Sequence, residues 1–469
     1  MNNINFLLQT GKPNNNAVIT NSDINLTYFE LHHHSDNVYK NIGERCLIFC
    51  LSENSIGCLV GYVSFISNNV VPLMLDSSIN LDLLASLVDI YSPKYLWVSN
   101  KKLSDFSDWT VRFSYLGYNL IANPNGIYHS LPKDLALLLT TSGSTGSPKL
   151  VRLSYDNIKA NAESIAEYLS IDEHERPITT LPLSYSFGIS IINSHLIKGA
   201  TILLTSKSLM EKEFWSFLKE QQATSMSGVP YTYEMLKKLR FFKMDIPSLK
   251  TLTQAGGKLN NELNKEFSEY FVKTSRRFFV MYGQTEATAR MSYLPPEYSL
   301  TKLGSMGIAI PGGEFSLIDD LGSVINDNEI VGELVYKGRN VSLGYAECGD
   351  DLIKGDENQG VLITGDLAKR DADGFYYIVG RKKRFIKIYG NRVNLDETER
   401  LLKSIISDCA CVGVDDHMKI YINDKSRLDE VRNFISLKTG IHHSAFTVKH
   451  IDLIPKNSSG KTIYSSLTV

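Results

Sequence analysis

The stretch "LTTSGSTGSPKLVRLS", residues 139–154, decides the fold of this chain. Glycine, serine and threonine fill its centre, and Pro148 and Lys149 close it. Such a loop suits phosphate, because glycines let the backbone approach closely while amides and hydroxyls donate hydrogen bonds to anionic oxygens. Taken alone, the loop is also consistent with a polar surface turn.

The residues around Lys149 indicate which kind of phosphate loop this is. A Walker loop needs a glycine before the lysine and a helix after it. Here Pro148 precedes the lysine, and the hydrophobic run "KLVRL" that begins at the lysine is typical of a strand. We therefore predict a hairpin with residues 142–147 at its tip, which excludes a Walker-type ATPase or kinase.

Length, composition and charge narrow the class of protein. The 469 residues suffice for a large domain and a smaller one, and 43% of them are hydrophobic. The formal net charge of -2 gives no basic surface for nucleic acid. The six cysteines form no CxxC pair, so we expect reduced thiols rather than a zinc site or disulfides. Without a secretory signal or a membrane helix, a cytoplasmic protein with no membrane insertion is expected.

The pattern of hydrophobic residues alternates between strand and helix. "CLIFCLS" at 46–52 is typical of a buried strand and "SIGCLVGYVSFIS" at 55–67 of a helix, and the alternation continues to about residue 222. This order predicts parallel sheets with helices on their faces. From 304 to 380 the glycines are dense and the apolar runs short, which predicts antiparallel strands.

Six more motifs follow the loop in the chain. They are "LPLSYSFGIS" (181–190), "QAGGKL" (254–259), "MYGQTEAT" (281–288), "GELVYKGRNVSLGY" (332–345), "TGDLAKRDADGFYYIVGRKKRFIKIYGNRV" (364–393) and "IPKNSSGKTI" (454–463). This series resembles the acyl-adenylate-forming superfamily, which includes acyl-CoA synthetases, peptide-synthetase adenylation domains and luciferases. The resemblance covers nearly the whole chain.

The resemblance implies an α/β protein of two domains. Residues 1–382 would form a large domain of parallel-type sheets with helices and a small β-barrel-like part. Residues 383–469 would form a small, mobile α+β lid domain that swings about Lys383. One orientation would present Lys461 for adenylation, and the other would present the face from Lys387 to Gly390 so that a thiol can reach the adenylate.

The implied reaction joins a carboxylate to ATP, releases pyrophosphate, and passes the acyl group to a thiol of coenzyme A or a carrier-protein phosphopantetheine. Because carboxylate and triphosphate repel each other, the site must supply positive charge. Thr285 would donate to the α-phosphate, and Glu286 would bind Mg²⁺. Lys461 would bridge the carboxylate oxygen and the α-phosphate when the lid closes.

The resemblance also implies the ATP-binding residues. Asp366 would accept the ribose hydroxyls with Arg381 beside it, and Tyr282 would stack on adenine. The remaining implied ATP-binding residues are Thr141, Ser142, Gly143, Ser144, Thr145, Gly146, Lys149, Gly256, Gly257 and Gly283.

The acid is expected to be a small carboxylic acid other than an α-amino acid. Amino-acid-activating relatives carry an aspartate in the segment equivalent to "SYSFGIS", and a buried ammonium without a counter-charge is costly. The candidate pocket residues are Tyr185, Ser186, Phe187, Ser227, Gly228 and Val229. A stand-alone amino-acid adenylating enzyme, an acyl-AMP ligase with a non-thiol acceptor, a luciferase-like enzyme and a non-catalytic descendant stay open as alternatives.

Overall fold

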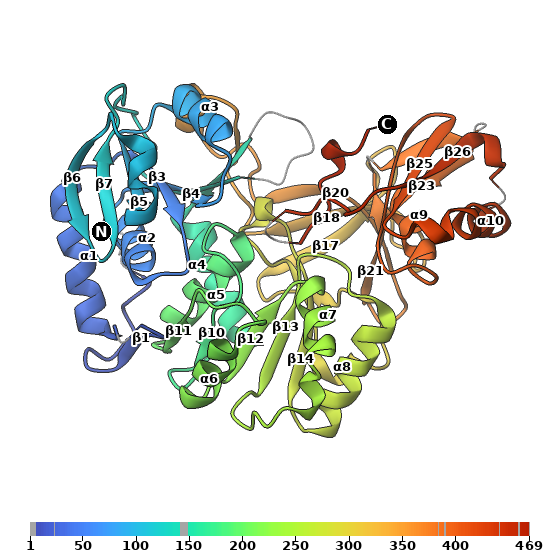
Figure 1. The fold of residues 1–469 in the computed structure, drawn as a ribbon, viewed down its shortest axis with the longest axis horizontal. Coiled ribbons are helices and arrows are strands. Elements are labelled where there is room, and N and C mark those ends of the chain that lie inside the picture. Colours follow the sequence, from blue (N-terminus) through green and yellow to red (C-terminus); the bar gives the residue numbers. More distant parts are fainter. Residues whose placement is uncertain are drawn as a thin grey trace. The chain divides into compact units, whose positions relative to one another are not determined.

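The computed structural model describes residues 6–22, 24–140, 149–382, 384–388, 391–439, 441–457 and 460–468. The chain divides into two compact units (Figure 1). The first contains residues 1–143, 147–314 and 337–362, and the second contains residues 144–146, 315–336 and 363–469. Because Lys383 lies outside the described residues, the hinge and the 382/383 boundary stay predictions.

One sheet of the first unit is built around parallel strands. Its order is β19-β9-β8-β4-β3-β5-β7-β6, in which β3 pairs in parallel with β4 and β5, and β4 with β8. The bounds are β3 Leu47–Ser52, β4 Val71–Asp76, β5 Tyr95–Ser99, β6 Thr110–Tyr115, β7 Tyr118–Ala122, β8 Leu135–Thr140, β9 Leu150–Ser154 and β19 Gly344–Ala346, with helices α1 Tyr28–Ile42, α2 Ile56–Ser67 and α3 Leu81–Tyr91. The predicted strand–helix alternation is confirmed here.

The second sheet of this unit has the order β16-β15-β14-β13-β12-β10-β11-β1-β2 (Figure 1). The bounds are β1 Asn16–Thr20, β2 Leu26–Thr27, β10 Pro177–Ile178, β11 Ile202–Leu204, β12 Ser225–Gly228, β13 Thr251–Gln254, β14 Arg277–Tyr282, β15 Ser292–Leu294 and β16 Ile308–Ala309, with helices α4 Tyr155–Tyr168, α5 Ser186–Leu196, α6 Lys212–Glu220, α7 Pro230–Lys238 and α8 Asn261–Lys273. Strands β12, β13 and β14 are parallel, and Gly228, Gln254 and Val280 are in register. The motifs that follow these strands therefore meet at one edge of the sheet.

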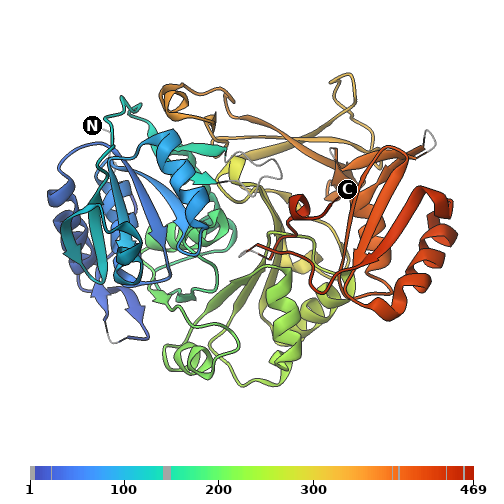
Figure 2. The same ribbon diagram turned by 45° about the horizontal axis from the view of Figure 1, so that its top comes forward.

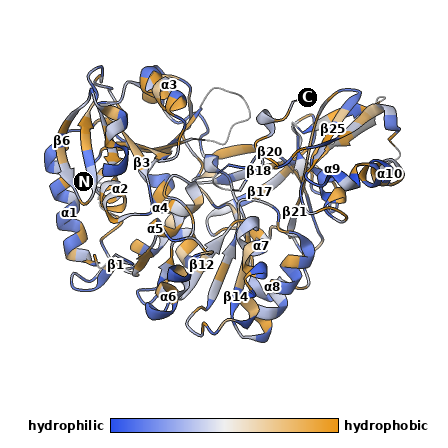
Figure 3. Ribbon diagram, viewed as in Figure 1, coloured by the Kyte–Doolittle hydropathy of each residue, from blue (hydrophilic) through white to orange (hydrophobic). Residues whose placement is uncertain are grey.

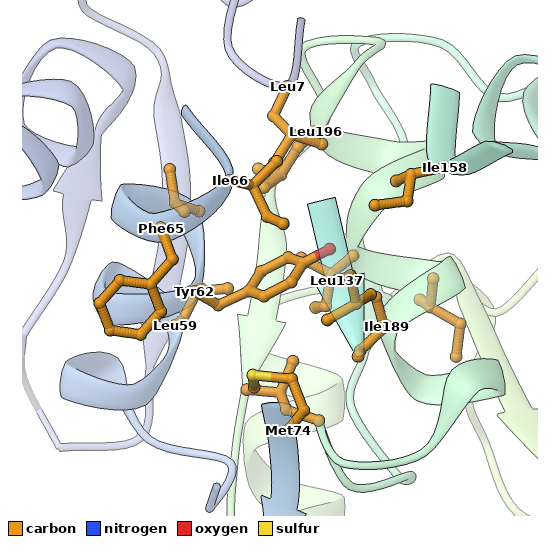
Figure 4. Close-up of a cluster of buried hydrophobic side chains, with 14 of the residues drawn as sticks. Leu7, Leu59, Tyr62, Phe65, Ile66, Met74, Leu137, Ile158, Ile189 and Leu196 are labelled. Carbon is orange, nitrogen blue, oxygen red and sulfur yellow. The ribbon is translucent and has the colours of Figure 1, made fainter. Parts of the chain in front are cut away.

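Burial of apolar side chains holds the helices against the sheets. On α8, Leu263, Phe267 and Phe271 are buried, and Figure 3 shows both hydrophobic and hydrophilic residues on this helix. By contrast, α2 is buried along almost its whole length. Figure 4 shows Tyr62 of α2 extending toward Leu137 of β8 and Ile189 of α5, so this helix lies in the core of the unit.

The second unit carries smaller sheets. A four-stranded sheet has the order β17-β18-β20-β21, and a hairpin and a three-stranded sheet follow it. The bounds are β17 Gly313–Ile318, β18 Gly332–Gly338, β20 Val361–Arg370, β21 Tyr376–Arg381, β22 Phe385–Ile388, β23 Asn391–Asn394, β24 Cys409–Val414, β25 His417–Ile422 and β26 Phe446–His450, with helices α9 Leu395–Leu402 and α10 Leu428–Thr439. Helices α9 and α10 pack side by side on the three-stranded sheet (Figure 2). Across the described ranges of both units, no helix has the length and apolarity that crossing a bilayer requires.

Candidate active site

The glycine-, serine- and threonine-rich loop at residues 141–148 connects two antiparallel strands. Strands β8 and β9 pair with Thr140 opposite Leu150 and Leu138 opposite Arg152. The predicted hairpin is therefore confirmed, and the strand-to-helix geometry of a Walker loop is absent from β8 and β9 as described. Residues 141–148 lie outside the described residues, so the roles of Thr141 to Gly146 stay predictions.

Lys149 directly precedes β9, which pairs with β19. The two strands are antiparallel, with Leu150 opposite Ala346 and Val151 opposite Tyr345. This pairing brings the Lys149 ammonium to 2.5 Å from the Glu347 carboxylate and 5.9 Å from the centre of the Tyr345 ring. The predicted phosphate-binding lysine thus lies between an exposed acid and an aromatic face.

Tyr345 joins this lysine to the predicted metal ligand. Its hydroxyl donates to Oε1 of Glu286 over 2.7 Å. The pKa of the Tyr345 hydroxyl is raised by burial and by the Glu286 charge, so the hydroxyl stays protonated and donates. The motif ending at Tyr345 was identified from the sequence, but this contact was missed because it depends on the pairing of β19 with β9.

The turn that carries Glu286 is held by a segment far along the chain. The Ser342 amide donates to the Glu286 carbonyl over 2.8 Å, and the Asn340 amide side chain donates to the Ala287 carbonyl over 2.9 Å. Thr288 has a φ of 67° and donates its hydroxyl to the Asn340 carbonyl over 2.7 Å. These bonds stabilise an unusual backbone conformation at Thr288 and hold the turn from which the Glu286 side chain projects.

Further motif residues have defined surroundings at this turn. A Cβ on Gly283 would lie 1.7 Å from the Ala289 carbonyl oxygen, so only glycine fits there. The hydroxyls of Ser186 and Thr285 lie 3.2 Å apart, which joins the start of α5 to the predicted α-phosphate donor. Tyr282 ends β14, and its hydroxyl accepts a hydrogen bond from Gln284 over 3.1 Å.

The predicted acid pocket is assembled around Gly256. This glycine has a φ of 82°, and a Cβ on it would lie 2.6 Å from the Tyr185 hydroxyl and 3.0 Å from Val229 Cγ1. Burial raises the pKa of Tyr185 to about 12, so its hydroxyl is neutral. The Tyr185 ring centre lies 6.2 Å from that of Phe187. The structure therefore brings three candidate pocket residues, Tyr185, Phe187 and Val229, together around the predicted ATP-binding residue Gly256.

Three other predicted site residues contact their neighbours in the fold. Ser227 shares a hydrogen bond with the Thr253 hydroxyl at 2.7 Å. A Cβ on Gly228 would lie 2.6 Å from the Thr232 side chain, and one on Gly257 would lie 3.1 Å from Pro230 Cγ. These residues shape the loop before α7.

The second unit carries the predicted ribose site. Asp366 on β20 and Arg381 on β21 are in register, and Oδ1 of the aspartate lies 3.3 Å from Nε of the arginine. Asp366 is buried, whereas Arg381 is exposed. Lys387 is exposed too, and its amide donates to Asp415 Oδ1 over 2.8 Å. Lys383 and Gly390 lie outside the described residues.

Lys461 makes two hydrogen bonds with Asn457. The Asn457 amide donates to the Lys461 carbonyl, and the Lys461 amide donates to Asn457 Oδ1, both over 2.9 Å. Gly460, which precedes the lysine, has a φ of 74°. The chain that follows is anchored at Tyr464, whose hydroxyl donates to Glu399 over 2.9 Å. These contacts hold the Lys461 backbone, from which its side chain projects.

The donor set of the first unit fits Mg²⁺ and a nucleotide triphosphate. Oε1 of Glu286 accepts the Tyr345 hydrogen bond, and its Oε2 accepts none from the residues that the structure describes. A carboxylate with a free oxygen is the kind of ligand that Mg²⁺ uses together with phosphate oxygens. Lys149 carries a compact positive charge of the kind that suits phosphate.

Comparison with known proteins agrees with this geometry. The profile of the AMP-binding enzyme family matches residues 9–346. This chain belongs to that family. It is 30% identical over 351 residues to 4-coumarate--CoA ligase-like 2 of Arabidopsis thaliana, and the match covers 71% of this chain and 61% of that relative. It is 30% identical over 345 residues to 2-succinylbenzoate--CoA ligase of Bacillus licheniformis, and that match covers 71% of this chain and 70% of the relative.

A solved structure shows that the fold is shared along the whole chain of this AMP-binding enzyme. The O-succinylbenzoate coenzyme A synthetase (MenE) of Bacillus subtilis in complex with AMP superimposes with a TM-score of 0.81 at 22% identity. The match covers 99% of this chain and 98% of that one. The same synthetase is also known in complex with ATP and a magnesium ion. The predicted superfamily and the α/β fold are confirmed.

Proposed function

We propose that this AMP-binding enzyme is an AMP-forming acid–CoA ligase. It would activate a carboxylic acid with ATP to an acyl-adenylate and pyrophosphate, and then pass the acyl group to the thiol of coenzyme A. The observation that carries the proposal is the arrangement of Lys149 and Glu286 around Tyr345, next to the contact between Ser186 and Thr285.

Each of these groups has a role in neutralising the triphosphate. Lys149 and the amides and hydroxyls of the 141–146 loop would hold the β- and γ-phosphates. Glu286 would hold Mg²⁺, which supplies further positive charge when bound. Thr285 would donate to the α-phosphate oxygen while the substrate carboxylate attacks the phosphorus, and pyrophosphate leaves in line with the attack.

The second unit would complete the reaction. Asp366, oriented by Arg381, would accept hydrogen bonds from both ribose hydroxyls. Lys461 would bring its charge to the attacking carboxylate and the α-phosphate. We further propose that residues 383–469 turn about Lys383 between the two half-reactions, which would replace Lys461 by the face from Lys387 to Gly390.

The substrate and acceptor follow from the pocket and the relatives. Relatives of this chain are named for 4-coumarate, 2-succinylbenzoate and ferulate, and all three names denote acids without an α-ammonium group. The segment from Tyr185 to Ser190 offers no carboxylate to an α-ammonium. Coenzyme A is our choice of acceptor, since these relatives are CoA ligases, and a carrier-protein pantetheine is the alternative. The six cysteines are all free, which favours the cytoplasm.

The test is a panel of carboxylic acids incubated with Mg²⁺-ATP, with and without coenzyme A. Hydroxylamine traps the acyl-adenylate as a hydroxamate, and the released phosphate species is identified in parallel. We expect pyrophosphate, AMP and a CoA thioester with at least one acid. Release of ADP, or ATP turnover that no acid stimulates, would overturn the proposal.

A further inference from the structure

Arg290 is a buried cation beside the candidate acid pocket. Only 2% of the residue is exposed, and its guanidinium carbon lies 4.8 Å from the centre of the Phe187 ring. Its Nη1 donates to the Tyr168 hydroxyl over 3.2 Å and lies 3.6 Å from Met281 Sδ. Its Nε is buried and makes no hydrogen bond within the described ranges of the chain.

Among the described residues, no carboxylate compensates this guanidinium. The contacts of its side chain are with Phe187, Tyr168 and Met281, and the sequence of residues 141–148 contains no acid. Burial raises the pKa of Tyr168 and lowers that of His195 to about 3, so both neighbours are neutral at neutral pH. An arginine stays charged in proteins, and a buried charge without a partner is costly.

Another buried arginine of the same unit shows the usual arrangement. Arg152 is also fully buried, but it pairs with Glu357 at 2.5 Å and donates to the carbonyls of Leu343 and Tyr345. The fold thus gives one buried guanidinium a carboxylate partner and leaves the other without one among the described residues. This difference indicates that the partner of Arg290 comes from outside the chain.

The position of Arg290 identifies where such a partner would arrive. Phe187 is close to both Arg290 and Tyr185: its ring centre lies 4.8 Å from the Arg290 guanidinium carbon and 6.2 Å from the Tyr185 ring centre. Tyr185 in turn faces Gly256, and Ser186 contacts Thr285. Arg290 is therefore linked through Phe187 to the candidate acid pocket, whereas Ser186 links the same helix start to the predicted α-phosphate donor.

We propose that Arg290 binds a second anionic group, a carboxylate, at the end of the acid substrate remote from the reacting carboxylate. The substrate class is then a dicarboxylic acid. The planar guanidinium suits a carboxylate, because two of its N–H groups match the two oxygens. This inference rests on the proposed function, since it assigns the far end of the same substrate.

The first test measures binding and stability without catalysis. We compare the wild type with Arg290→Met, which keeps side-chain length and removes the charge, by thermal unfolding with and without dicarboxylates. Arg277→Met is the matched control, because Arg277 also lies over an aromatic ring, Phe279 at 5.8 Å, but at the opposite end of β14. Succinate, adipate and phthalate are the probes, against butanoate, hexanoate and benzoate.

The expected result separates a ligand-binding role from a structural one. Without ligand, Arg290→Met should unfold at the wild-type temperature or above it, because an apolar side chain replaces an unpaired buried charge. At least one dicarboxylate should raise the unfolding temperature of the wild type and of Arg277→Met, but not that of Arg290→Met. A large loss of stability in ligand-free Arg290→Met would overturn the inference, because the guanidinium would then be structural.

The second test measures adenylation with the same matched acids. The wild type should prefer the best dicarboxylate over its monocarboxylate by about 100-fold or more in kcat/KM, and Arg290→Met should lose that preference. Equal use of both acids by the wild type, or equal losses for both in the variant, would overturn the inference. A different outcome separates the two proposals: no acid supports pyrophosphate release, but a dicarboxylate still stabilises the wild type and Arg277→Met and not Arg290→Met. The proposed function then fails, and the anion site at Arg290 stands.

Discussion

The Tyr345 hydroxyl donates a hydrogen bond to the Glu286 carboxylate over 2.7 Å, although 59 positions separate the two residues in the chain. The contact orients one oxygen of the carboxylate and leaves the other for a ligand. Groups that orient a metal ligand in this way typically change metal affinity or activity by about 10- to 100-fold when they are removed.

Tyr345→Phe should therefore weaken Mg²⁺ use while the protein stays folded. We expect the Mg²⁺ concentration for half-maximal adenylation to rise about 10-fold. The phenyl ring keeps the contact with Lys149, so the apparent affinity for ATP at saturating Mg²⁺ should change little. Titration of acyl-hydroxamate formation with Mg²⁺ measures the effect, and an unchanged titration curve would show that Glu286 is not oriented by this hydroxyl.

We expect Glu347 to compete with phosphate for Lys149. The two side chains lie 2.5 Å apart and both are exposed, so their ion pair is weak and exchanging it for a phosphate would cost little. Glu347→Gln should lower the KM for ATP by about two- to fivefold, because it removes the competing charge. Steady-state kinetics over a range of ATP concentrations would detect this, and a higher KM would mean that Glu347 itself supports nucleotide binding.

Gly283 leaves no room for a side chain. A Cβ there would lie 1.7 Å from the Ala289 carbonyl, in the turn that positions Thr285 and Glu286. Gly283→Ala should lose about 1–3 kcal/mol of unfolding free energy and most of its adenylation activity. Gly355→Ala is the control, since a Cβ at Gly355 meets no atom within 4 Å. If both variants behave alike in urea unfolding, the close approach at Gly283 has no energetic consequence.

The sequence predicted the hairpin around the phosphate loop because proline and a hydrophobic run replace the features of a Walker helix. It predicted the strand–helix order because the hydrophobic period changes from element to element. It also supplied the residues around Gly256, since their motifs follow strands β10, β12 and β13, which are neighbours in a parallel arrangement.

The contacts between distant segments could not be predicted. Tyr345 reaches Glu286, and Glu347 reaches Lys149, only because β19 adds to β9 as an antiparallel edge strand. A three-residue strand has no recognisable period. Arg290 has the appearance of a surface residue in the sequence, and only its burial against Phe187 shows that it is a candidate for ligand binding.

Buried His195 predicts a loss of stability in acid. Burial lowers its pKa to about 3, from a usual value near 6.5, while its Nδ1–H donates to the Ile191 carbonyl over 2.8 Å. Below pH 6.5 the unfolded chain therefore takes up a proton that the folded chain does not. This lowers the free energy of unfolding by about 1.4 kcal/mol per pH unit until the folded pKa is reached.

His195→Asn keeps a donor for the Ile191 carbonyl and removes the titration. Between pH 6.5 and pH 5, we expect the free energy of unfolding, measured with denaturant, to fall by about 2 kcal/mol more in the wild type than in the variant. If this free energy depended on pH in the same way in both proteins, His195 would be protonated in the folded state too.

Lys461 is expected to serve the adenylation step and not the thiol step. Its backbone is held by the reciprocal hydrogen bonds with Asn457, so substitution of the side chain leaves the turn intact. A charged group positioned at the reacting oxygens contributes on the order of 10²–10³ in rate. Lys461→Ala should therefore lose acyl-adenylate formation by that factor. It should still bind ATP, because Lys149, Tyr282 and Asp366 remain.

Supplying the acyl-adenylate separates the two steps. With presynthesised acyl-AMP, Lys461→Ala should form the CoA thioester at nearly the wild-type rate, because Lys461 would have left the site when the thiol arrives. Lys456→Ala is the matched control: this neighbouring lysine pairs with Asp408 at 2.7 Å and should affect neither step. Since the Lys461 side chain is not part of the core, the unfolding temperature should not change. If folded Lys461→Ala lost both half-reactions equally, one placement of residues 383–469 would have to serve both steps, and the proposed turn about Lys383 would be wrong.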